Sequence, residues 1–199
     1  MLDRDLLREP LWFLVRFAVV VGVLYLLRAD ISTLYLALVT PPANWLLGDM
    51  GATYVRQGHE LGLVYSRLGL RFTVHDIIYQ NLLVAVALFA ATRARPRWKL
   101  AWGTVAVVVL WASHVVSLYL GGHVIIWDFL WGLPPELRQE LGPRVAAHFP
   151  AERDWLLSRL FGLWHTWGRQ SLVLAIWGLA SLPVLQGVLG AEPEAHPGS

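Results

Sequence analysis

The sequence contains no cysteine among its 199 residues. This absence excludes disulfide bonds, metal sites built on thiolates and a catalytic thiol. Charged residues are also scarce, at 15% of the chain against about a quarter of a typical soluble domain. The formal net charge is only +2, and no basic stripe is interleaved with aromatic residues. These features argue against a nucleic-acid partner.

Long stretches of the chain lack charge altogether. Residues 100–127 and 170–191 contain no Asp, Glu, Lys or Arg, and 56% of all residues are hydrophobic. Uncharged apolar runs of about 18 residues or more are typical of membrane-spanning helices. Because several such segments occur together, the sequence predicts an integral membrane protein rather than a soluble protein with one buried helix.

The predicted fold class is an all-α integral membrane protein with about four transmembrane helices, outer-side amphipathic helices and a small β-hairpin. The predicted spans are residues 10–28, 77–92, about 100–121 and about 168–189. Residues 1–190 are expected to form a single membrane-embedded domain. Residues 191–199 are polar and rich in proline and glycine, which predicts a disordered tail.

The distribution of basic residues predicts the orientation of these spans. Arg93, Arg95, Arg97 and Lys99 form the densest basic cluster in the chain. The positive-inside rule places this short loop in the cytoplasm. Both termini are then cytoplasmic, and the segments 29–75 and 122–167 lie on the outer side.

Two proline-containing regions of the outer segments predict short helices. Pro41-Pro42 divides residues 31–48, which favours two short interfacial helices, with a fifth, incomplete span as the alternative. Pro135, Pro143 and Pro150 stand where further helices are expected to begin. The last of these helices, over 151–163, is amphipathic and is expected to lie on the outer leaflet.

A β-hairpin is predicted between the first two spans. Apolar residues alternate with other residues before and after Ser66-Arg67, which is typical of two paired strands with one apolar face. Leu68, Leu70, Phe72 and Val74 make up much of that face. We expect it to pack on the outer ends of the spans or on a partner protein.

Polar residues gather at one predicted depth, near the outer boundary of the hydrocarbon. They are His75, Asp76, Gln80 and Asn81 around the start of the second span, His114 and Ser117 in the third, His123 just beyond it, and His165 and Arg169 at the start of the fourth. Such residues are costly in a membrane unless they face the bundle interior or a wet cavity, so they indicate a functional site. Structural roles remain alternatives: an N-cap for Asp76, a core histidine bonded to a backbone carbonyl for His114, and interhelical hydrogen bonds for Gln80 and Asn81.

The polar cluster supports only a limited chemistry. Histidines with Asp76 or Asp128 could bind zinc, but their spacing matches no zinc signature, so no metal and no other cofactor is predicted. Ser113 and Ser117 flank His114, yet a serine nucleophile needs a base within hydrogen-bonding distance, which adjacency in sequence does not supply. If the protein is an enzyme, the candidate catalytic residues are Asp76, His114 and His165.

The order of elements over residues 58–122 and 161–180 resembles the exosortase/archaeosortase superfamily of membrane-embedded, cysteine transpeptidase-like proteases. The shared arrangement is an outer hairpin entering a helix, a basic inner loop, an uncharged helix, an outer amphipathic segment and a histidine opening the next helix. The resemblance implies a cysteine after the hairpin, an arginine near the outer end of the next helix and a histidine opening the last. Here His75-Asp76 stands at the cysteine position, "SHVVSLYL" contains no arginine, and only His165 matches in type.

The chain looks closest to the cysteine-free membrane protein associated with exosortase H, a companion of the sorting enzyme. This resemblance implies a non-catalytic, multi-pass protein of the bacterial inner membrane. Its implied partners are the lipid bilayer and an exosortase-type enzyme. Two other interpretations stay open: a divergent membrane peptidase or transpeptidase with an unorthodox Asp/His site, and an unrelated membrane assembly subunit.

Overall fold

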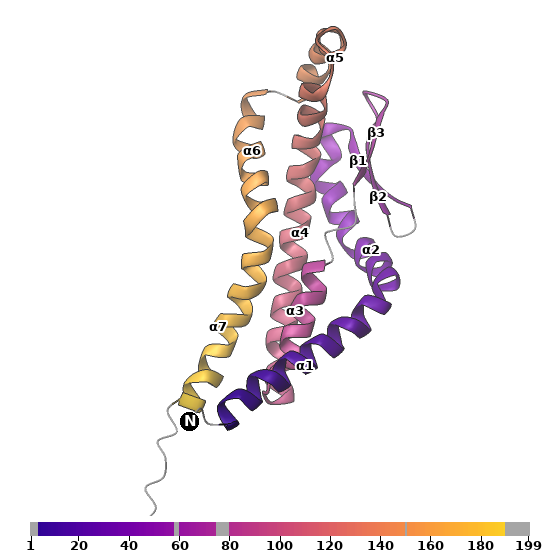
Figure 1. The fold of residues 1–199 in the computed structure, drawn as a ribbon. Coiled ribbons are helices and arrows are strands. Elements are labelled where there is room, and N and C mark those ends of the chain that lie inside the picture. Colours follow the sequence, from indigo (N-terminus) through magenta and orange to yellow (C-terminus); the bar gives the residue numbers. More distant parts are fainter. Residues whose placement is uncertain (1–3, 58–59, 75–79, 150, 190–199) are drawn as a thin grey trace, which may run out of the picture.

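The structure, a computed structural model, describes residues 4–57, 60–74, 80–149 and 151–189 (Figure 1). The helices are α1 (Arg4–Leu26), α2 (Arg28–Leu47), the short 3-10 helix η1 (Gly48–Met50), α3 (Gln80–Ala91), α4 (Pro96–Gly132), α5 (Pro135–His148), α6 (Ala151–Leu163), the π-helical turn η3 (Trp164–Gly168) and α7 (Arg169–Leu189). The strands are β1 (Ala52–Gln57), β2 (Glu60–Tyr65) and β3 (Leu70–Val74). The protein is therefore mostly helical with one small sheet. The predicted disordered tail, 191–199, lies outside the described residues.

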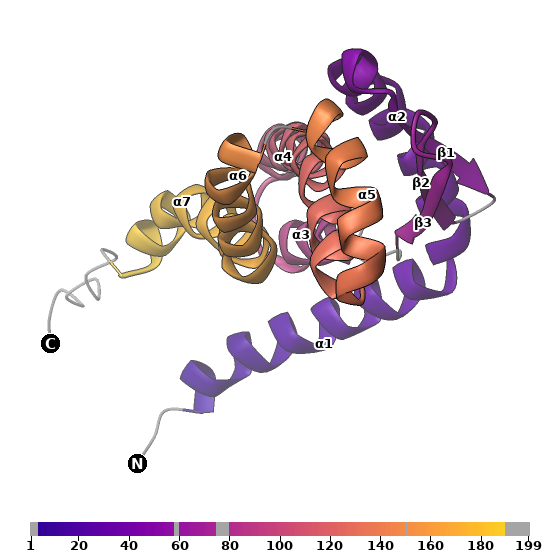
Figure 2. The same ribbon diagram turned by 90° about the horizontal axis from the view of Figure 1, so that it is seen from above.

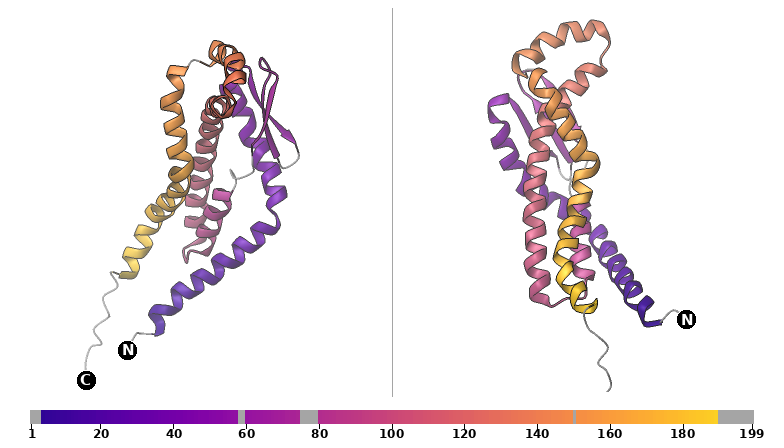
Figure 3. Two further views of the ribbon diagram at one scale, coloured as in Figure 1. Left: turned by 45° about the horizontal axis from the view of Figure 1, so that its top comes forward. Right: turned by 90° about the vertical axis from the view of Figure 1, so that its left-hand side faces the viewer.

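Helix α4 is the axis around which the other elements are arranged (Figures 1 and 2). Helix α2 and the sheet lie on one side of it, while α6, η3 and α7 form an almost continuous antiparallel helix on another side (Figure 3). Helix α3 packs beside the N-terminal half of α4, and α1 crosses the bundle obliquely in contact with α3. Every layer of the fold is thus positioned by α4 or by a neighbour of α4.

Helix α4 is longer than the predicted third span. It runs without a break from Pro96 to Gly132, beyond the predicted end of the span near residue 121. The reason is that no proline occurs between Pro96 and Pro134, and the Gly121-Gly122 pair is held in the helix by close neighbours. A Cβ on Gly122 would lie 2.7 Å from Cδ2 of Leu47, so this position allows α2 and α4 to approach each other closely.

Within the described residues, two helices are long and apolar enough to span a membrane. They are Arg8–Leu26 within α1, of which none of the apolar window is buried inside the protein, and α4, of which 44% is buried. Helix α3 and the segment Ser171–Pro183 of α7 are apolar but shorter. Large apolar side chains such as Leu11, Val19 and Leu26 are exposed along α1. Soluble monomers rarely leave an apolar surface of this kind uncovered.

Helix α2 is continuous through Pro41-Pro42, so the predicted division into two short helices is wrong. Proline lacks an N–H group, and Pro42 therefore cannot donate to the carbonyl of Leu38 one turn earlier. The indole Nε1–H of Trp111 on α4 donates to that carbonyl instead, at 3.2 Å. Trp111, 73 positions away from Leu38 in sequence, thus supplies the hydrogen bond that Pro42 cannot donate to the Leu38 carbonyl.

The outer helices agree only in part with the proline pattern. Helix α5 begins at Pro135 and α6 covers 151–163, so the predicted bounds of both are confirmed. Helix α6 runs along α4 in line with α7, which does not match the predicted helix lying flat on the outer leaflet (Figure 3). Pro143 lies inside α5 rather than at a helix start, so that prediction is wrong. Pro150 lies outside the described residues.

The sheet has three antiparallel strands in the order β1-β2-β3, one more than the predicted hairpin. The pairing of β2 with β3 places Leu63 opposite Phe72 and Tyr65 opposite Leu70. The connecting turn covers 66–69, with Gly69 at a φ of 69°, and is longer than the Ser66-Arg67 turn expected. Strand β1 escaped prediction because only two of its side chains are buried, which leaves a weak alternating pattern.

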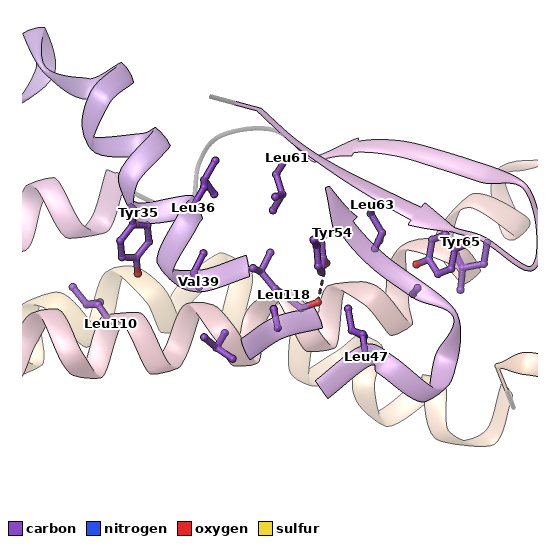
Figure 4. Packing of buried hydrophobic residues seen from close by; sticks show 14 of the residues in the cluster. Tyr35, Leu36, Val39, Leu47, Tyr54, Leu61, Leu63, Tyr65, Leu110 and Leu118 are labelled. Carbon is purple, nitrogen blue, oxygen red and sulfur yellow. Dashed lines mark hydrogen bonds between the residues drawn. The ribbon is translucent and has the colours of Figure 1, made fainter. Parts of the chain in front are cut away.

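The apolar face of the predicted hairpin packs on the helices, as expected. Leu61, Leu63 and Tyr65 are buried in the main core, together with residues of α2 and α4 (Figure 4). The ring of Phe72 meets the ring of Phe129 on α4 edge-on, with 5.0 Å between centroids. The core therefore lies between α2, the sheet and the C-terminal half of α4.

We predict that the hydrogen bond from Trp111 to the Leu38 carbonyl stabilises the protein because Pro42 cannot donate to that carbonyl. Trp111→Phe should lower the free energy of unfolding in detergent by about 1 kcal/mol, since the Leu38 carbonyl loses its donor. In a Pro42→Ala background the new backbone N–H can pair with that carbonyl, so the same Trp111→Phe change should cost much less. Thermal unfolding of the four proteins in this double-mutant cycle measures the difference.

Trp102→Phe is the matched control, because Trp102 lies on the same helix and is partly exposed. It should change stability little in either background. Equal costs of Trp111→Phe with and without Pro42 would contradict the proposed pairing.

Candidate functional site

The predicted polar cluster is only partly brought together. His114, Ser117 and His123 are buried on α4, and His114 has no exposed surface. Gln80 is exposed and Asn81 is half-buried at the start of α3, while His165 is exposed in η3. Arg169 begins α7. His75 and Asp76 lie outside the described residues. The buried part of the candidate site therefore lies on α4 alone.

His114 links α4 to α2. Its Nδ1 atom shares a hydrogen bond of 2.5 Å with the hydroxyl of Tyr35, and the two rings meet edge-on. Tyr35 is itself buried, on the face of α2 that packs on α4. His114 is thus a buried core histidine, but its partner here is a tyrosine hydroxyl rather than the backbone carbonyl expected. Sequence analysis missed Tyr35, because a single tyrosine in an apolar run carries no signal of its partner.

Ser117 links α4 to η3. Its hydroxyl donates to the carbonyl of Ser113 at 2.8 Å and accepts the indole Nε1–H of Trp164 at 2.7 Å. The hydroxyl of Ser113 likewise donates to a carbonyl of α4, that of Leu110. Both serine protons are thus held by their own helix. Neither serine has the arrangement of a nucleophile whose proton is taken by an adjacent base.

Two tyrosines from the sheet reach the backbone of α4. The hydroxyl of Tyr54 donates to the carbonyl of Leu118 at 2.8 Å (Figure 4), and that of Tyr65 donates to the carbonyl of Gly122 at 2.6 Å. The two acceptors are one helical turn apart, and each carbonyl has a second lone pair beyond the one used within the helix. Burial, with a smaller contribution from Tyr65, raises the pKa of Tyr54 well above its ordinary value. Tyr54 therefore stays a protonated donor.

Asn44 fixes the sheet to α2. Its side-chain Nδ2 donates to the carbonyl of Tyr54 at 2.9 Å, and its Oδ1 accepts the backbone N–H of Tyr54 at 2.7 Å. These two hydrogen bonds occupy the backbone N–H and C=O of Tyr54 at the free edge of β1, so another strand cannot pair with β1 at this position. Asn44, Tyr54 and Tyr65 were absent from the sequence-based site, because their partners are backbone groups far away in the chain.

The turn η3 presents Trp164 rather than His165 to α4. A Cβ on Gly168 would lie 2.3 Å from the ring of Trp164, so only glycine lets the indole fold back along its own helix. His165 instead lies beside the ring of Phe161, with 5.4 Å between centroids. Single π-helical turns of this kind occur frequently at functional sites. Here the turn sets the direction of one tryptophan.

An apolar cleft of about 470 Å³ lies between α4 and the α6–η3 helix. Its lining includes Ser113, Val116 and Leu120 on α4, and Leu163 and Trp164 opposite. The described part of the lining carries no ionisable group, so it suits a hydrocarbon chain or an apolar side chain better than a polar substrate. Among the described residues, no three His, Cys, Asp or Glu side chains lie close enough to hold a metal ion.

Comparisons of the chain with protein-family models, with curated proteins and with solved structures give no match. Any function is therefore argued from the residues of this chain.

We predict that Gly168→Ala acts through Trp164. The added methyl group displaces the indole and breaks its bond to Ser117, so the free energy of unfolding should fall by about 1–3 kcal/mol. Gly162→Ala is the control, because a Cβ there meets nothing within 4 Å. It should be neutral or slightly stabilising, since alanine favours a helix over glycine. Thermal unfolding in detergent compares the variants.

The coupling with Ser117 is the sharper measurement. In a Ser117→Ala background the bond is already absent, so Gly168→Ala should cost less than it does in the parent protein. Strictly additive costs would show that Gly168 acts elsewhere.

Proposed function

We propose that this protein is a non-catalytic, multi-pass membrane protein that accompanies an exosortase-type sorting enzyme. The observation that carries the non-catalytic part is the hydrogen bonding on α4. His114 and Ser117 occupy the stretch where the resemblance implies an arginine, and both are tied to neighbouring helices through Tyr35 and Trp164. With no thiol in the chain, nothing replaces the nucleophile of the sorting reaction.

The proposed membrane arrangement uses α1, α3, α4 and α7 as spans. Helix α4 is about 55 Å long at about 1.5 Å per residue, whereas the hydrocarbon of a bilayer is about 30 Å thick. If its inner boundary lies near Lys99, the hydrocarbon ends about 20 residues later, close to Leu118. The sheet, which contacts α4 at Leu118, Gly122 and Phe129, would then lie at the outer surface. We place the protein in the bacterial inner membrane with both termini in the cytoplasm.

Reporter fusions test this topology. Fusions at residues 95 and 199 should report the cytoplasm, because the basic cluster from Arg93 to Lys99 holds its loop inside. A fusion near residue 140, in α5, should report the outer side. An outer signal at residue 95 would overturn the orientation.

The accessory role is supported by the order of elements. The chain has a hairpin leading to α3, a basic loop, the apolar helix α4, the outer helices α5 and α6, and His165 close to the start of α7. This order matches the exosortase-like arrangement, while the catalytic residue types implied by it are missing at two of three positions. A protein that keeps the arrangement without the chemistry fits a companion of the enzyme.

One observation favours a second candidate function. His165 is exposed within a π-helical turn, a geometry that is common at functional sites. A divergent membrane peptidase could use His165 together with Asp76, and this alternative makes a different prediction for conservative substitutions.

Processing of a tagged sorting substrate in the host distinguishes the two functions. Asp76→Asn, His114→Gln and His165→Gln should each leave processing modestly reduced or unchanged at matched protein levels. Interhelical hydrogen bonds average about 0.6 kcal/mol, whereas loss of a catalytic residue costs several orders of magnitude in rate. Deletion of the whole gene should impair processing by an exosortase encoded beside it.

A cysteine substitution in that neighbouring exosortase is the positive control for complete loss. If one conservative change in this chain abolishes processing while its membrane level holds, the accessory function is wrong. The Asp76/His165 site then becomes the leading proposal.

A further inference from the structure

A second cavity lies at the opposite end of the molecule from the sheet, where α1 passes the loop between α3 and α4. It has a volume of about 670 Å³ and is lined by Arg8, Glu9, Trp12 and Arg16 of α1 and by Arg93 of the loop. Figure 1 shows this part of α1 near the loop-side ends of α3 and α4. The cavity belongs to no part of the α4 site described above.

The lining combines a basic face with one ion pair. Arg8, Trp12 and Arg16 are spaced four residues apart, so they share one face of α1. Glu9 forms an ion pair with Arg93, which joins α1 to the loop. Arg8 and Arg16 form no ion pair with any described residue. The described lining residues, three arginines and one glutamate, carry a net charge of +2.

The position of Arg16 within α1 favours an anion in this cavity. It lies inside the apolar segment Arg8–Leu26 of α1, two turns from its start. A charge within such a segment is costly unless it is paired or reaches the interface. Guanidinium groups bind phosphate oxygens in a bidentate manner, and basic pockets between helices on the cytoplasmic side bind lipid headgroups.

We propose that this cavity binds the headgroup of an anionic glycerophospholipid of the inner leaflet. Arg8 and Arg16 hold the phosphate oxygens, and Trp12 between them lies at the level of the glycerol and ester groups, where tryptophan is favoured. Val15 and Val19 continue the same face of α1 and are exposed, so they offer a surface to the acyl chains. The charge of +2 favours a headgroup with two phosphates over a headgroup with one.

This proposal rests on the membrane assignment and on the cytoplasmic location of the basic loop, but not on a role in protein sorting. A free phosphate shares the headgroup chemistry. The apolar continuation through Trp12, Val15 and Val19 is what favours the lipid. The experiment therefore separates these two sources.

Native mass spectrometry of the full-length protein, delipidated in detergent, tests the site. Titration with diphosphatidylglycerol, phosphatidylglycerol and phosphatidylethanolamine should give binding in that order of strength. The double variant Arg8→Gln/Arg16→Gln should bind diphosphatidylglycerol roughly tenfold more weakly or worse, because charge-assisted hydrogen bonds are lost. Arg95→Gln/Arg97→Gln removes the same charge from the adjacent loop, outside the cavity lining, and should bind like the parent protein.

Two further variants give readouts that general destabilisation would not produce. Glu9→Gln removes the negative charge of the cavity, so it should retain or strengthen lipid binding. Arg16→Lys keeps the charge but loses the bidentate geometry, so its affinity should be intermediate. Loss of binding in Glu9→Gln would contradict the electrostatic basis of the site.

The remaining outcomes are each decisive. Equal weakening by the Arg95/Arg97 control would show non-specific charge attraction and would overturn the site. Displacement of the lipid by millimolar inorganic phosphate or glycerol phosphate would assign the cavity to a free phosphate instead. Displacement only by an acidic peptide would assign it to a protein partner.

A protein that leaves the membrane fraction without detergent would refute the membrane assignment. Failed sorting with intact lipid binding would refute the proposed function alone.

Discussion

The buried polar groups of α4 have to find partners on neighbouring elements, and the rest of the structure depends on this constraint. The partners are Tyr35 on α2, Tyr54 and Tyr65 on the sheet, and Trp164 on η3. Each neighbouring element thereby meets α4 at a defined height, because a displacement along α4 would separate these side chains from their partners. An unpaired buried group costs about 1–3 kcal/mol, more than a paired one contributes. The polar pairs therefore specify the register, while apolar contacts fill the space between them.

Such pairs have a particular value if the surroundings are lipid. Apolar side chains then gain nothing from leaving water, so close packing and polar contacts specify which helices meet. Gly122 and Gly168 fit this logic, since one allows Leu47 to approach α4 and the other allows Trp164 to fold back toward Ser117. The Trp111–Leu38 bond follows the same rule at a proline. The hydrogen bond that Pro42 cannot make within α2 is thus replaced by a hydrogen bond from α4.

Local patterns in the sequence were enough to predict the features that depend on neighbours in the chain. The alternating face of β2 and β3, the start of α5 and the extent of α6 belong to this class. The continuity of α2 could not be predicted, because the donor that makes Pro42 tolerable comes from α4. Strand β1 is held by Asn44 and by pairing with β2 rather than by its own alternation. In both α2 and β1, hydrogen bonds from residues distant in the chain, rather than local secondary-structure propensity, determine the structure.

The candidate site was predictable in depth but not in direction. Counting along predicted spans placed His114, Ser117 and His165 at a similar height, yet the count does not state which way each side chain points. In the structure His114 and Ser117 face neighbouring helices, whereas His165 is exposed beside Phe161. The residue of η3 that reaches α4 is Trp164, one position earlier. One position on a helix is a rotation of about 100°, which separates a structural contact from an exposed group.

The two ends of the molecule are held together by different means. Around the C-terminal half of α4, several buried hydrogen bonds fix α2, the sheet and η3. Helix α1 has no buried residue in its apolar window, but it packs along α3 and places the ring of Phe13 on Trp177, and the exposed Glu9–Arg93 pair joins it to the loop. Exposed ion pairs contribute only about 0–1 kcal/mol, so they do not fix the angle of a helix by themselves. The apolar contacts of α1 with α3 and α7 therefore contribute more to its position than the ion pair does. An anion held between Arg8, Arg16 and Arg93 would add a polar connection between α1 and the inner loop.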